Sequence, residues 1–283
     1  MNQLETVLML IFFGILAVVF NGLGYRKGYF VLPRYEKDER LVCGPDVVIC
    51  FGIYIGLFFF ISYIIFHLGF SLANLFKIDT PALNLYLATI LQLISGLFAI
   101  ILFYSYARHR GIERFKQVLK RSSHPIIQDI GMGAMTYVIS MPGVFFVNQL
   151  IEQITIGVYG SEGPKQNAVQ FFQQTTQNPL LTIFALIAIL FIAPFFEEFL
   201  FRGLLQTYLK QLLGTKAAIL LSSICFAFFH FSKDQGVGNI ALIPTLFVFA
   251  LYLGFIYERQ RSLAASITLH FVFNLVGVVR ILI

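Results

Sequence analysis

The chain has 283 residues, of which 58% are hydrophobic and only 12% are charged. Globular proteins carry about 25% charged residues, so this composition excludes an ordinary soluble domain. The formal net charge of +6 then indicates loops that face anionic lipid, and it does not indicate a nucleic-acid-binding surface.

Long apolar runs recur along the whole chain and predict an all-α, polytopic membrane protein with about eight transmembrane helices. In chain order the predicted spans are 6–24, 46–70, 82–106, 126–151, 180–212, 216–232, 240–258 and 262–282. The N-terminus lacks the basic region of a signal peptide, so the first run is predicted to be a retained span. The three cysteines, Cys43, Cys50 and Cys225, have no metal-type spacing and are predicted to be free thiols.

The chain divides into four N-terminal spans (1–151), a polar connection (152–179) and four C-terminal spans (180–283). The connection is rich in Gln, Asn, Gly and Thr. It is either a flexible loop or the site of a short interfacial helix around residues 168–172. We find no internal repeat, so a repeat-built transporter gains no support.

The connecting loops alternate in charge. Basic residues follow the first, third, fifth and seventh spans: Arg26, Lys27, Arg34, Lys37, Arg40, Arg108, Arg110, Arg114, Lys116, Lys120, Arg121, Lys210, Lys216, Arg259 and Arg261. The intervening loops hold only Lys77, Lys165 and Lys233. The positive-inside rule therefore predicts an integral multi-pass protein with both termini outside the cytoplasm.

Two adjacent glutamates, Glu197 and Glu198, lie inside the fifth predicted span. An ionisable group within a bilayer is costly, so such residues are paired, line a wet cavity or take part in chemistry. Glu198 stands four residues before Arg202, the favourable order for an ion pair on a helix, and we interpret that pair as structural. Neighbouring residues on a helix point about 100° apart, which leaves Glu197 as the free carboxylate. Pro194 is expected to kink the helix and open room for water beside it.

Three more polar residues lie at a matching depth in other spans. Gly214 marks a tight turn, and nearly the same number of residues separates it from Glu197 and from His230, which puts both at roughly 24 Å along their helices. His270 and Asn274 are spaced i,i+4 in the last span, as are Phe226 and His230 in the sixth. Taken singly, such residues are more often satisfied buried groups or interhelical hydrogen-bond partners. Their common depth favours a catalytic or ligand-binding site.

This set is complete for amide hydrolysis without a covalent intermediate. A buried carboxylate near an imidazole can activate water as a general base. A second histidine with an asparagine one turn away can donate hydrogen bonds to a developing oxyanion.

In this arrangement Glu197-Glu198-x-x-x-Arg202, Phe226-x-x-x-His230 and His270-x-x-x-Asn274 resemble the three motifs of the CAAX protease and bacteriocin-processing family of intramembrane proteases. That family includes the type II CAAX prenyl endopeptidases. The resemblance covers residues 180–283, and the first four spans carry no motif that we can match. It implies an eight-span helical protease with its catalytic core in the last four helices and a peptide or lipid-modified peptide as substrate.

By the same resemblance, Glu197 activates water with His230, while His270 and Asn274 hold the oxyanion. Glu198, Arg202 and Phe226 have supporting roles. Family members are often labelled metalloproteases, and Glu197, His230 and His270 could together bind zinc. The chain has no His-Glu-x-x-His helix, and asparagine is a poor zinc ligand. We therefore favour no metal cofactor, with zinc as the alternative.

Two other functions stay open from the sequence. One is a non-catalytic membrane protein that binds a peptide or bacteriocin, as an immunity or scaffold protein. The other is a proton- or ion-coupled transporter, because intramembrane glutamates and histidines also form relays.

Overall fold

The computed structural model describes residues 3–33, 41–76, 80–120, 122, 124–161, 163–164 and 166–283. Within them the chain is helical apart from one isolated β-bridge between Lys120 and Ser262, which confirms the predicted fold class. The three cysteines are free, as predicted.

The elements follow one another as α1 (Gln3–Arg26), α2 (Gly44–Phe76), α3 (Thr80–Arg110), α4 (Ile112–Leu119), α5 (Ile126–Tyr159), α6 (Asn167–Thr175), α7 (Pro179–Ile187), η1 (Ala188–Ile192), α8 (Ala193–Glu198), η2 (Phe199–Gln206), α9 (Thr207–Leu213), α10 (Thr215–Phe229), η3 (Lys233–Gln235), α11 (Gly238–Gln260) and α12 (Leu263–Leu282). η1 and η2 are π-helical, and η3 is a 3₁₀ turn. The five elements from α7 to α9 form one continuous helical segment, Pro179–Leu213.

In the described part of the chain, seven helices rather than about eight are long and apolar enough to cross a membrane. The predicted sixth span, 216–232, is the exception. It corresponds to α10, which has 15 residues and ends at Phe229. At 1.5 Å per residue such a helix is about 22 Å long, whereas a bilayer core is about 30 Å thick. The helix ends at Phe229, and after Phe231 the chain continues into polar residues, Ser232 and the turn η3.

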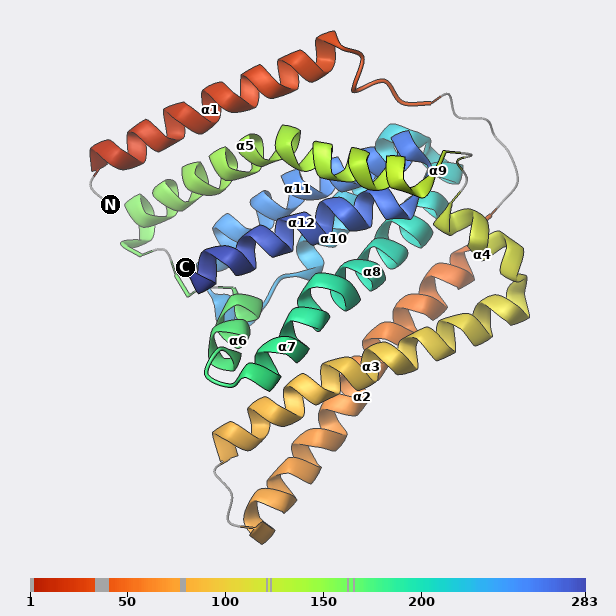
Figure 1. The fold of residues 1–283 in the computed structure, drawn as a ribbon, viewed down its shortest axis with the longest axis vertical. Helices are drawn as coiled ribbons and strands as arrows, with labels where there is room; N and C mark the ends of the chain where they lie inside the picture. Colours follow the sequence, from red (N-terminus) through yellow and green to blue (C-terminus); the bar gives the residue numbers. More distant parts are fainter. Residues whose placement is uncertain are drawn as a thin grey trace.

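The helix α11 lies at the centre of the bundle and contacts α5, α10, α12 and η2. In the most apolar 18-residue stretch of α11, half of the residues are buried. In the corresponding stretches of α1 and α2, 6% are buried. In Figure 1, α1 runs along the outer side of α5, and the α2–α3 hairpin flanks the opposite side of the bundle. The α2–α3 hairpin also contacts the segment that carries the two glutamates: α2 packs against η2, and α3 packs against α7. The bundle therefore encloses that segment between α2–α3 and the α10–α12 layer.

Close backbone packing holds α5 against α12. A Cβ atom added to Gly133 would lie 2.3 Å from the carbonyl oxygen of Ala265, so only glycine fits there. Small residues at helix crossings are a common means of bringing membrane helices together. A polar link joins α1, α5 and α11: Asn21 of α1 donates to the Ile139 carbonyl of α5 and accepts from the Tyr252 hydroxyl of α11.

The polar connection contains a helix, α6, which resolves the choice between a loop and a short helix in favour of the latter. Phe172 of α6 is buried, and Asn178 caps the following helix, α7. Six of the basic residues used to orient the chain lie outside the described residues: Arg34, Lys37, Arg40, Lys77, Arg121 and Lys165. The orientation of the termini therefore stays a prediction.

Candidate active site

The helical segment that carries the two glutamates is interrupted on both sides of them by π-helical segments. η1 ends two residues before Pro194, and η2 begins directly after Glu198. Proline lacks an N–H and its ring clashes with the carbonyl four residues earlier, so a regular α-helical bond cannot form there. The chain thus adopts a π-helical turn where the sequence predicts a kink. Turns of this kind occur frequently at functional sites.

Glu198 is the fully buried partner of two groups. Its Oε1 lies 3.1 Å from Arg202 Nη1 and 2.9 Å from His270 Nδ1. Arg202 is fully buried as well, donates to the Ala250 carbonyl and lies over the Phe226 ring at 4.3 Å. The predicted i,i+4 ion pair is present, but Glu198 also fixes His270, a contact that the sequence does not predict.

Glu197 faces two histidines. Its Oε2 lies 3.5 Å from His230 Nε2 and 3.9 Å from His270 Nε2, and this buried oxygen makes no hydrogen bond. The side chain is 13% exposed. The structure therefore brings Glu197, His230 and His270 together around one carboxylate oxygen.

The hydrogen bonds of the two histidines determine which ring nitrogen faces Glu197. His230 Nδ1 lies 2.9 Å from the Phe226 carbonyl oxygen, and a carbonyl can only accept, so this nitrogen carries a hydrogen. His270 Nδ1 likewise donates to the Glu198 carboxylate. In both rings Nε2 is then the atom that gains or loses a proton, and in both rings it points at Glu197.

Asn274 lies one turn beyond His270 and bonds to the backbone of η1. Its Nδ2 donates to the Ile189 carbonyl at 2.9 Å. That carbonyl has lost its helical partners, because the N–H of Ala193 bonds to Ala188 and position 194 is a proline without an N–H. One amide hydrogen of Asn274 thus satisfies a carbonyl that Pro194 leaves unpaired, and the second is left for another acceptor.

The charges of this cluster nearly balance. Glu197 and Glu198 carry two negative charges when ionised, and Arg202 supplies one positive charge. One protonated imidazole brings the cluster to neutrality, which is the favourable condition for charges inside a membrane protein.

One further residue lies near the site. Tyr54 of α2 packs its ring against Phe196 and Phe229, with ring centroids 5.7 and 6.5 Å apart. The sequence gives no signal for it, because α2 carries no motif and Tyr54 precedes the glutamates by more than a hundred residues.

Glu197, His230 and His270 are the residues that the sequence offers for zinc. In the described part of the chain, no group of three or more His, Cys, Asp or Glu side chains is spaced to hold a metal ion. No step below is derived through a metal ion.

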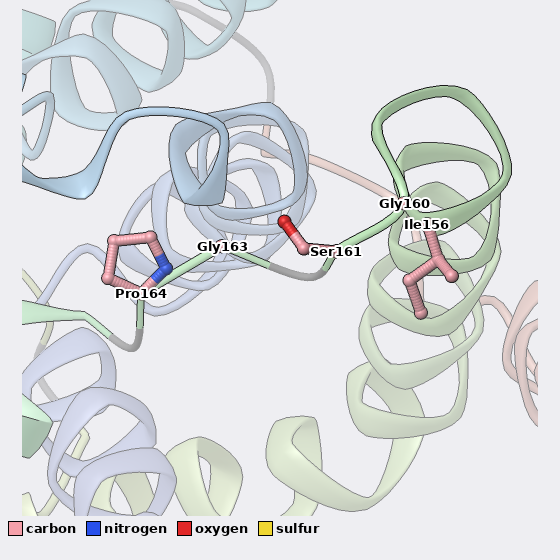
Figure 2. A pocket seen from close by; sticks show the side chains of 5 residues that line it. All are labelled: Ile156, Gly160, Ser161, Gly163 and Pro164. Atoms are coloured by element: carbon pink, nitrogen blue, oxygen red, sulfur yellow. The ribbon is translucent and has the colours of Figure 1, made fainter.

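A pocket of about 480 Å³ lies elsewhere, at the end of α5 and the turn that follows it (Figure 2). It is lined by Ile156, Gly160, Ser161, Gly163 and Pro164, and it includes none of the cluster residues. None of these five lining residues has a side chain suited to acid–base chemistry.

Residues 179–276 match the family model described as "Type II CAAX prenyl endopeptidase Rce1-like". This segment is an Rce1-like type II CAAX prenyl endopeptidase domain. It contains every cluster residue named above except Tyr54. Comparisons with curated proteins and with solved structures returned no match. The Rce1-like domain confirms the family that the three motifs resemble, and it implies an intramembrane endopeptidase that acts on a peptide.

Proposed function

We propose that this protein is an intramembrane endopeptidase in which Glu197 activates water for attack on a peptide bond. The observation that carries the proposal is the convergence of two imidazole Nε2 atoms on Glu197 Oε2, at 3.5 and 3.9 Å. That oxygen is buried and makes no hydrogen bond, so it can accept a proton from a water molecule.

The reaction divides the work between the two histidines. Neutral His230 carries its hydrogen on Nδ1 and offers the lone pair of Nε2 to the same water, which orients it beside Glu197. The water loses a proton to Glu197, and its oxygen bonds to the carbonyl carbon of the scissile peptide. The proton then passes from Glu197 to the leaving nitrogen as the carbon–nitrogen bond breaks, which yields a carboxylic acid and an amine.

His270 and Asn274 stabilise the oxyanion in this proposal. His270 in its imidazolium form holds the Glu198 carboxylate with Nδ1–H and presents Nε2–H on the Glu197 side. This assignment also supplies the positive charge that neutralises the cluster. Asn274 contributes the amide hydrogen that Ile189 does not use. Donors held in advance at the place where charge develops are usually the largest catalytic term.

The substrate that we propose is a peptide within or anchored to the membrane, including a lipid-modified peptide. The exposed side chains of α1 and α2 are largely apolar, which suits contact with lipid on the way to the site. We also propose that both termini lie outside the cytoplasm, on the charge alternation of the loops. This orientation needs an even number of crossings, so α10 and the residues that link it to α11 must together complete an eighth crossing.

The test uses purified protein in liposomes with quenched fluorescent transmembrane or lipid-modified peptides. Glu197→Gln keeps the shape of the side chain and removes the base, so cleavage should fall by at least about 10²-fold. Glu113→Gln is the matched control, because Glu113 is exposed and forms an i,i+3 ion pair with Lys116. Cleavage by Glu197→Gln at the wild-type rate would show that the mechanism is wrong.

Chelation and cellular assays separate the alternatives. Activity should survive dialysis against EDTA, with no stoichiometric zinc in metal analysis. Loss of activity that zinc restores would favour the metalloprotease version. A cellular phenotype that survives Glu197→Gln would favour a non-catalytic peptide-binding role.

A further inference from the structure

The helix α2 places one polar side chain next to the active-site cluster. Its core-facing residues include Cys50, Phe51, Ile53 and Leu57, which are apolar, and Tyr54, which carries a hydroxyl. α2 lies outside the matched domain, residues 179–276. Tyr54 therefore adds a polar side chain from outside the matched domain to this region.

The Tyr54 ring contacts two side chains that are sequence neighbours of Glu197 and His230. Its ring packs on Phe196, the neighbour of Glu197, and on Phe229, the neighbour of His230. These contacts fix the ring between the two chain segments that carry the base and its imidazole partner.

The hydroxyl of Tyr54 has no partner of its own. A buried tyrosine usually finds a hydrogen-bond partner for its O–H. Tyr54 is only partly buried, and within the described residues its hydroxyl makes no hydrogen bond. Among the other tyrosines of this core, Tyr29, Tyr106 and Tyr252 bond to Thr136, Asp46 and Asn21 respectively.

We propose that Tyr54 donates a hydrogen bond to the reacting peptide carbonyl in the reaction at Glu197. This inference rests on the proposed function. A phenol is a suitable donor to a developing oxyanion, and its ring is held in place by packing rather than by a polar partner. The active site is then completed by α2 and is not confined to the Rce1-like domain.

The test compares Tyr54→Phe with wild-type protein in the liposome cleavage assay. The substitution keeps the ring that packs on Phe196 and Phe229 and removes only the hydroxyl. Loss of one oxyanion donor lowers kcat by on the order of 10²-fold, with KM nearly unchanged. Tyr63→Phe is the matched control, because Tyr63 is on the same helix and 65% exposed, and it should behave as wild type. The thermal midpoint of Tyr54→Phe should equal that of wild type, which excludes a folding effect.

The outcomes are distinguishable. If wild type cleaves, Glu197→Gln does not and Tyr54→Phe keeps the wild-type kcat, this inference is overturned and the proposed function stands. A rise in KM with unchanged kcat also overturns it, because it would assign Tyr54 to uniform substrate binding. If wild type cleaves none of the peptides, the proposed function fails and this inference fails with it.

Discussion

Asn274 and Pro194 are predicted to be energetically coupled. Pro194 leaves the Ile189 carbonyl without a helical donor, and the Asn274 amide replaces that donor at 2.9 Å. Asn274→Leu removes the amide and retains a side chain of similar size. The carbonyl is then left unpaired beside apolar neighbours, so the protein should lose stability.

The magnitude follows from two measured ranges. A buried polar group without a partner costs about 1–3 kcal/mol. Interhelical hydrogen bonds in membrane proteins contribute about 0.6 kcal/mol on average, with a maximum near 1.7. We therefore expect Asn274→Leu to lower the free energy of unfolding by about 1–2 kcal/mol.

Pro194→Ala should reduce that loss. The restored N–H at position 194 allows a regular α-helical ladder, in which the Ala193 N–H returns to the Ile189 carbonyl. In that background Asn274→Leu should cost less than about 0.5 kcal/mol, so the coupling energy of the pair is about 1 kcal/mol. The assay is reversible unfolding in mixed micelles followed by circular dichroism, since the chain has no tryptophan.

Asn148→Leu is the control for this double-mutant cycle. Asn148 accepts from Thr245 in the contact between α5 and α11, away from η1. Its cost should be the same with and without Pro194→Ala. Equal costs of Asn274→Leu in the two backgrounds would refute the idea that Asn274 replaces the missing backbone donor.

Two further predictions concern the ion pair and the topology. Arg202→Met should destabilise the protein by about 3–5 kcal/mol in the same unfolding assay, because it leaves Glu198 buried without its guanidinium, and adding Glu198→Gln should restore much of the loss. Equal stability of the single and double variants would contradict this. Alkaline phosphatase fused after Ile283 should be active, and green fluorescent protein fused at the same position should not fluoresce. Insertion of each reporter after Gly111 should give the opposite pattern. The reverse result at either site would contradict the orientation.

The membrane class and the common depth of motifs that are far apart in the sequence could be predicted, because both follow from counting residues along the chain. Apolar run length predicts the helices, and the rise per residue predicts that Glu197 and His230 lie at one depth. The i,i+4 spacing likewise predicts the pair of Glu198 with Arg202. The length of α10 could not be predicted in this way, because its apolar run continues through Phe231 while the helix ends at Phe229.

The contacts within the cluster could not be counted from the sequence. Side-chain directions follow the 100° rule only in a regular α-helix, and the glutamates lie between two π-helical segments. The bond from His270 to Glu198 and the bond from Asn274 to Ile189 both depend on those segments. Tyr54 was missed for a different reason, since tertiary packing alone brings α2 to the site.

Backbone irregularity explains how two of the site side chains are oriented. The first is the loss of a donor at Pro194, which frees the Ile189 carbonyl for Asn274. The second is the end of α10, where the His230 N–H bonds to Ala227 rather than to Phe226, and the Phe226 carbonyl takes His230 Nδ1 instead.

In both places a side chain satisfies a carbonyl that the helix has released, as buried backbone groups require. For His230 the same bond directs Nε2 toward Glu197, and for Asn274 it leaves one amide hydrogen free. The irregular helix turns therefore orient His230 and Asn274 within the apolar bundle, because each side chain bonds to a backbone carbonyl that the helix leaves unpaired.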